Sequence, residues 1–108
     1  MISYDMFKDM INLMNTVSVE LDNFNRGMER VLGSDSSSMY YAPLNIVENY
    51  IISILQIELG ESKEGAEWFI YDGLSQINRG GTEIEENGKT YTIKSLKDYY
   101  DYLISLNS

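Results

Sequence analysis

Apolar residues recur along the first third of the chain with alternating spacings of three and four positions. They are Phe7, Met10, Met14, Val17, Leu21, Phe24, Met28 and Val31. This a/d rhythm of a coiled-coil seam predicts an α-helix over residues 4–32, with Ser3 as its N-cap and Gly33 as its C-terminal stop. Apolar neighbours such as Ile11 and Leu13 widen the stripe, so the helix is expected to contact more than one neighbour.

Two further helical patterns follow a serine-rich stretch. Residues 33–42 are polar and predict a loop. Pro43 has the fixed φ that suits a first helical position, and the apolar spacing predicts a second helix over residues 43–59, antiparallel to the first. Residues 62–72 favour a short third helix with aromatic anchors, although its segment "EWFIY" is equally compatible with a strand.

The stretch "TEIEENGKTYTI" predicts a β-hairpin over residues 82–93. Asn87-Gly88 is the preferred pair for a type I′ turn, and both flanks alternate between polar and apolar residues. The expected pairs are Glu86 with Lys89, Glu85 with Thr90 and Ile84 with Tyr91. This register puts Ile84 and Tyr91 on the face to be buried, with the neighbouring glutamates facing outward.

A last helix is predicted over residues 95–106, where Ser95 and Asp98 resemble a capping box. The elements together predict one domain, residues 1–108, of the α+β class and mostly helical. In it a long N-terminal helix packs with two to three further helices, and one β-hairpin lies on them. Because the heptad seam is longer than the second helix, its remainder is available to a second copy, and a homodimer is one expected outcome.

The formal charge of −9 changes this picture because it is concentrated in the middle of the chain. Residues 35–86 hold ten acidic and two basic residues. A concentrated negative charge repels nucleic acid and anionic membranes and favours a basic protein partner. The alternative is that the acidic residues only keep the protein soluble. The residues expected to bind the partner are Glu58, Glu61, Glu64, Glu67, Glu83, Glu85, Glu86, Tyr40 and Tyr41. The two tyrosines are included because they lie in a loop and tyrosine is enriched at interfaces.

The chain contains neither histidine nor cysteine. Without histidine it lacks the commonest general base, the commonest metal ligand and every Ser-His nucleophile. Without cysteine it has neither disulfides nor thiolate metal ligands. The segment "NGKT" belongs to the hairpin turn and lacks the upstream glycine of a phosphate-binding loop. We therefore expect no enzymatic activity, no cofactor and no metal.

The C-terminal part, "AEWFIYDGLSQINRGGTEIEENGKTYTIKSLKDYYDYL", resembles the ending of many small phage and prophage proteins. In those proteins an aromatic segment precedes a short hairpin and a terminal helix. In composition and organisation the chain is also similar to anti-CRISPR proteins, several of which inhibit RNA-guided nucleases by imitating the charge of DNA. The resemblance implies a phage-encoded inhibitor of a nucleic-acid-binding host protein, with an RNA-guided nuclease as the candidate partner and no direct binding of nucleic acid or membrane.

A second function class stays open, a structural or adaptor protein that assembles through its long heptad-patterned helix. Ionic strength separates the two classes, because charge mimicry weakens as salt rises while a hydrophobic interface holds. Met1 is followed by Asp5 and Asp9 rather than by a basic and then an apolar stretch, so no secretory signal is expected. The expected location is the cytoplasm of a bacterial host cell.

Overall fold

The structure is a computed structural model that describes residues 1–32 and 42–107, the side chains of residues 28, 29, 31, 32 and 42 excepted. Its elements are α1 (Tyr4–Leu32), α2 (Ala42–Leu59), α3 (Lys63–Trp68), the π-helical turn η2 (Phe69–Gly73), α4 (Leu74–Asn78), β1 (Thr82–Glu86), β2 (Lys89–Ile93) and α5 (Leu96–Leu106). The predicted α+β, mostly helical fold class is confirmed. Nearly all of the predicted serine-rich loop lies outside the described residues.

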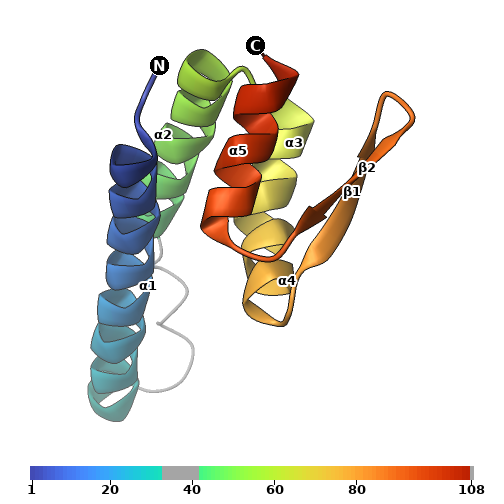
Figure 1. Cartoon of the computed structure of the whole chain (residues 1–108). Coiled ribbons are helices and arrows are strands. Elements are labelled where there is room, and N and C mark those ends of the chain that lie inside the picture. Colours follow the sequence, from blue (N-terminus) through green and yellow to red (C-terminus); the bar gives the residue numbers. More distant parts are fainter. Residues whose placement is uncertain (33–41, 108) are drawn as a thin grey trace.

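The helices form two layers, and the hairpin lies at one edge (Figure 1). The antiparallel pair α1 and α2 forms one layer, while α3 and α5 lie beside it and separate it from the hairpin. The sequence predicted that α1 contacts more than one neighbour, and it contacts both α2 and α5. The molecule is elongated, 52 Å along its longest axis, because the 29 residues of α1 follow that axis.

The third helix is longer than the sequence predicted. α3, η2 and α4 follow one another without a break, so the helix expected to stop at residue 72 continues to Asn78. Ser62 is its N-cap, because the Ser62 Oγ accepts the N–H of Gly65 at 3.0 Å. The segment "EWFIY" is therefore helical and not a strand. Its π-helical turn is an uncommon geometry that is often found at functional sites.

The hairpin has the register that the sequence predicted. Ile84 lies opposite Tyr91, and positive φ angles at Asn87 (55°) and Gly88 (76°) are those of a type I′ turn. Ile84 and Tyr91 are half-buried and pack against the helical core. The Tyr91 ring meets Tyr102 of α5 edge-on, with centroids 4.8 Å apart. This aromatic contact packs the hairpin against α5.

An aromatic cluster joins α1, η2 and α5. Phe7, Phe69 and Tyr99 contribute one ring from each element, and all three are completely buried. Phe69 and Tyr99 stack with their centroids 4.0 Å apart and their planes within 3°. The Phe7 ring lies 6.0 Å from Phe69 and 6.4 Å from Tyr99. Large buried rings contribute strongly to stability, so this cluster holds the two helical layers together.

The side of α1 that faces the core differs from the predicted seam. Phe7 and Met14 are buried as expected, but Phe24 is 49% exposed, so its prediction as a seam residue was wrong. Ile11 and Asn25 are buried instead. The other described seam residues whose burial is known are half-buried, so the buried side of α1 overlaps the predicted seam and departs from it mainly towards the C-terminal end of the helix. The apolar spacing alone did not predict this departure.

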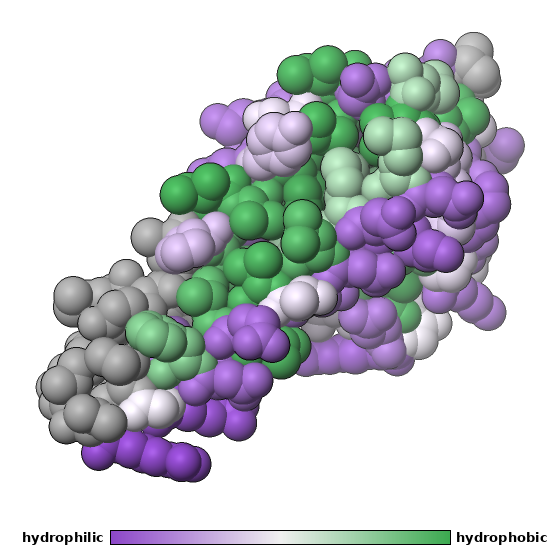
Figure 2. All heavy atoms as spheres, turned by 90° about the vertical axis from the view of Figure 1, so that its left-hand side faces the viewer, coloured by the Kyte–Doolittle hydropathy of each residue, from purple (hydrophilic) through white to green (hydrophobic). Residues whose placement is uncertain are grey.

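A further set of large apolar residues on α1 and α2 is exposed at the surface. Met6 and Leu13 of α1 and Ile46, Tyr50 and Ile57 of α2 are exposed, and we call this set the α1–α2 face. Their spacings of four and seven put the residues of each helix on one side of it. Figure 2 shows apolar side chains gathered over the side of the molecule on which α1 lies. Among the described helices, none has the length and apolar content of a membrane span.

Gly73 makes room for the only tryptophan of the chain, Trp68. A Cβ atom at Gly73 would lie 3.0 Å from the Cη2 and Cζ3 atoms of Trp68. Glycine inside a helix costs up to about 1 kcal/mol relative to alanine. Here the close approach of the indole to the backbone gives a physical reason for the glycine.

We predict that Gly73→Ala moves the Trp68 indole, whereas the matched change Gly27→Ala in α1 only stabilises. Nothing lies within 4 Å of a Cβ at Gly27, so alanine there should raise the free energy of unfolding by up to about 1 kcal/mol. Gly73→Ala should raise the free energy of unfolding by less than Gly27→Ala does, or lower it. It should also change the native emission of Trp68, because the added methyl group displaces the indole. Denaturation followed by fluorescence measures both, and equal stabilisation with unchanged emission would contradict the prediction.

Candidate functional site

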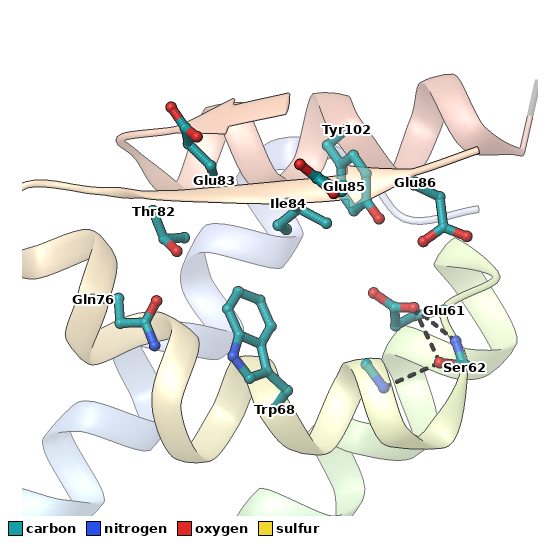
Figure 3. Close-up of a pocket in the computed structure, with 11 residues that line it drawn as sticks. Glu61, Ser62, Trp68, Gln76, Thr82, Glu83, Ile84, Glu85, Glu86 and Tyr102 are labelled. Atoms are coloured by element: carbon teal, nitrogen blue, oxygen red, sulfur yellow. Dashed lines mark hydrogen bonds between the residues drawn. The ribbon is translucent and has the colours of Figure 1, made fainter. Parts of the chain in front are cut away.

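A groove of about 480 Å³ separates α3 from β1 (Figure 3). Trp68 stands on its helical side, Glu61 and Glu86 lie at one end, and Tyr102 reaches it from α5. A second hollow of about 290 Å³ is also lined by Glu61, Glu86 and Tyr102, and extends to Asn107 at the end of α5. The two hollows therefore adjoin at these three side chains.

Four of the seven glutamates predicted to bind a partner line this groove. They are Glu61, Glu83, Glu85 and Glu86. Glu61 and Glu86 point into the gap, while Glu83 points away from it, as the alternation of side chains along a strand requires (Figure 3). No lysine or arginine is among the described residues that line the groove. The groove therefore concentrates negative charge.

The other three glutamates lie outside the groove lining. The Glu58 Oε2 is 3.0 Å from the N-terminal amino group of Met1, and the Glu67 Oε1 is 3.9 Å from the Nζ of Lys63. Glu64 is exposed. The predicted interface tyrosines, Tyr40 and Tyr41, lie outside the described residues. Four of the predicted glutamates therefore line the groove, and the other three lie outside its lining.

Glu61 is held in place by the fold. Its Oε2 accepts the hydroxyl of Tyr99 at 2.9 Å, and its Oε1 accepts the backbone N–H of Ser62 at 2.8 Å. It precedes the N-cap of the third helix, where the helix dipole stabilises negative charge. A Cβ at Gly65 would lie 2.9 Å from the Glu61 Oε2, so this glycine leaves space for the carboxylate.

Two tyrosines of α5 lie near Glu61, and both have raised pKa values. Burial, together with the Glu61 charge and hydrogen bond, holds the pKa of Tyr99 well above its usual range. Burial also raises the pKa of Tyr102 to about 12, with smaller contributions from the charges of Glu61, Glu86 and Tyr91. Both hydroxyls are protonated at neutral pH, as an ordinary tyrosine with a pKa of about 10 also is, and can donate hydrogen bonds.

The side chains of the groove suit binding of a cation better than covalent chemistry. Carboxylates and a phenol oxygen accept hydrogen bonds, and the Trp68 indole offers an aromatic wall. With no histidine and no cysteine in the chain, the groove contains no activated nucleophile of the familiar kinds. In the described part of the chain, no group of three or more acidic residues is placed to hold a metal ion.

The sequence did not single out Trp68 and Tyr102 as site residues, because aromatic residues in helices are also expected in a core. The signal that could have pointed to Trp68 is the glycine content of the third helix. Gly65 leaves space for the Glu61 carboxylate and Gly73 for the indole. Glycine is a poor helix former, so two glycines in one short helix indicate a close approach by other groups. No comparable local signal marks Tyr102.

Comparison of the chain with known protein families, with curated proteins and with solved structures found no match. The functional interpretation therefore depends on the geometry and chemistry of the groove. Three features of the groove determine which ligands fit it: its negative charge, the Trp68 indole and the Tyr102 hydroxyl.

Proposed function

We propose that the protein is a non-enzymatic binding protein that holds a basic protein against its acidic groove and hairpin. The observation that carries this proposal is a groove lined by four glutamates, of which Glu61 and Glu86 point into it, and by no described lysine or arginine. A hollow of one charge with low-dielectric walls focuses the electrostatic potential and attracts a partner of opposite charge.

The position of the hairpin suits a partner that normally binds nucleic acid. Glu83, Glu85 and Glu86 are exposed along β1, and the hairpin lies at the edge of the molecule (Figure 1). Carboxylates spaced along an exposed strand can enter a basic groove that otherwise binds phosphates. In the form that the phage-protein resemblance suggests, the protein inhibits a nucleic-acid-binding host protein, such as an RNA-guided nuclease, in the bacterial cytoplasm.

A second candidate function is assembly through the α1–α2 face. Leu13 is 58% exposed and Ile57 is 77% exposed, although both are large apolar residues. Exposed apolar patches of this kind are typical of protein–protein interfaces. In this alternative the protein is a structural or adaptor protein, and a second copy of the chain is the occupant of the face.

We predict that the triple variant with Glu83, Glu85 and Glu86 changed to Lys folds but no longer inhibits its target. Exposed charges add little to stability, whereas reversing them creates repulsion against a basic partner. Inhibition by the parent protein should also weaken steeply as ionic strength rises. DNA-cleavage assays with purified RNA-guided nucleases over a range of salt concentrations measure both effects, and circular dichroism reports the fold.

The matched control for this variant reverses Asp5, Asp9 and Glu20 on α1. These residues are exposed, and their reversal changes the net charge by the same amount without touching the groove. The control should inhibit as the parent does. A folded hairpin variant with unchanged inhibition, or equal losses in both variants, would show that the groove and hairpin are not the binding surface.

For the assembly candidate, we predict that Leu13→Glu combined with Ile57→Glu converts an oligomer into a monomer. Two charges on the α1–α2 face would oppose burial of that face. Val19→Glu is the control, because Val19 is 56% exposed on α1 but lies on another side of the helix from Leu13. Size-exclusion chromatography with light scattering reports the mass, and a parent that stays monomeric at high concentration rules out this function.

A further inference from the structure

Three polar groups meet at one end of the groove, and we call this place the carboxylate end. They are the carboxylates of Glu61 and Glu86 and the hydroxyl of Tyr102. Glu61 lies just before the third helix, Glu86 ends β1 and Tyr102 lies in α5, so the arrangement depends on how the third helix, the hairpin and α5 pack. Figure 3 shows Glu61 and Glu86 facing the gap between helix and strand, with the Tyr102 hydroxyl directed into the same space.

The Tyr102 hydroxyl is the observation that points to a ligand. Tyr102 is only 6% exposed, and its ring is packed against Tyr91. Ser105 donates to the backbone carbonyl of Tyr102, but within residues 1–32 and 42–107 the phenol hydroxyl has no hydrogen-bond partner. Tyr99 differs, since its hydroxyl donates to Glu61. Among the described residues, the buried side-chain polar atoms without a partner belong to Asn25, so the Tyr102 hydroxyl is not enclosed but opens on the two hollows, where a ligand can reach it.

The charges at the carboxylate end select a cation. The oxygens of Glu61 keep acceptor capacity after their bonds to Tyr99 and Ser62, because each carboxylate oxygen has two lone pairs. Glu86 lies opposite Lys89 in the hairpin, yet the ion pairs among the described residues involve other carboxylates. The phenol oxygen is a further acceptor. A ligand with several N–H donors and a positive charge satisfies all three groups.

Trp68 narrows the choice of cation to a planar one. Its indole stands between α3 and β1, beside the carboxylate end, and is held there by the close approach to Gly73 (Figure 3). A guanidinium group stacks on aromatic faces and presents a flat fork of five N–H donors that matches carboxylates. An ammonium group is a compact point charge without that fork.

We propose that the carboxylate end of the groove binds the guanidinium group of one arginine of a protein partner, with Trp68 as the stacking wall. This inference rests on the proposed function, in which a basic protein docks on the groove and hairpin, and it names the side chain that anchors the partner. At about 480 Å³ the groove is within the size range of small-ligand sites.

Titration with the peptide acetyl-Gly-Gly-Arg-Gly-Gly-amide at low salt tests this site. Because Trp68 is the only tryptophan, its emission and its indole N–H resonance report binding at the groove. The peptide should shift both signals saturably, and the same peptide with Lys in place of Arg should bind at least about tenfold more weakly. No saturable shift, or equal affinity for the two peptides, would overturn the assignment to arginine.

Tyr102→Phe is the sharpest variant because it removes only the hydroxyl. That hydroxyl has no partner in the described fold, so the variant should melt no lower than the parent but bind the arginine peptide about tenfold more weakly. Glu86→Gln should weaken binding of the arginine peptide to a similar degree without unfolding the protein, since Glu86 is exposed.

Tyr99→Phe is the structural control. It should lower the melting temperature because it removes the hydrogen bond to Glu61. Unchanged peptide affinity in the Tyr102 and Glu86 variants would refute the site.

The failure of this inference is distinguishable from failure of the proposed function. If the hairpin triple variant loses nuclease inhibition while Tyr102→Phe and Glu86→Gln keep the parent's peptide affinity, the arginine site is rejected and the proposed function stands. If the arginine peptide binds as expected while the triple variant inhibits normally, the proposed function is rejected and the arginine site stands.

Discussion

The stacking of Tyr99 on Phe69 is the contact on which both the core and the groove depend. The two rings lie 4.0 Å apart and nearly parallel, and Phe7 of the long helix packs against both. The hydroxyl of the same tyrosine donates to Glu61, so one side chain fixes α5 against the third helix and also orients a groove carboxylate. Because α5 also carries Tyr102, a shift of this helix would change the core and the carboxylate end together.

The third helix contains poor helix-forming residues at the positions where side chains of the groove lie close to its backbone. Gly65 and Gly73 are both poor helix formers, and each lies where a Cβ would meet a side chain of the groove. The π-helical turn between Phe69 and Gly73 likewise departs from regular geometry. The two glycines have a clear role, since they leave space for Glu61 and Trp68. Such conflicts between local propensity and global structure are typical of functional sites.

The molecule has two faces of contrasting chemistry. The acidic groove and hairpin lie on one side of the layer formed by α3 and α5, and the apolar α1–α2 face lies on the other side (Figures 1 and 2). A partner bound at the first face would be held by electrostatic attraction, which salt screens, whereas association through the second face would depend on burial of apolar surface, which salt does not screen. Because the faces are separate, one does not obstruct the other.

The sequence by itself determined the local structure of this protein. Helical spacing and caps place the long helix at residues 4–32, and the Asn87-Gly88 turn sets the hairpin register, because these signals act between residues close together in the chain. It also indicated that glutamates would form an acidic surface. Only the tertiary structure decided that Asn25 is buried and Phe24 is exposed on α1, since burial at that end of the helix depends on the neighbouring elements and not on apolar spacing. It likewise decided that Tyr102 and Glu61, far apart in the sequence, share one groove, because packing between distant elements leaves no local pattern.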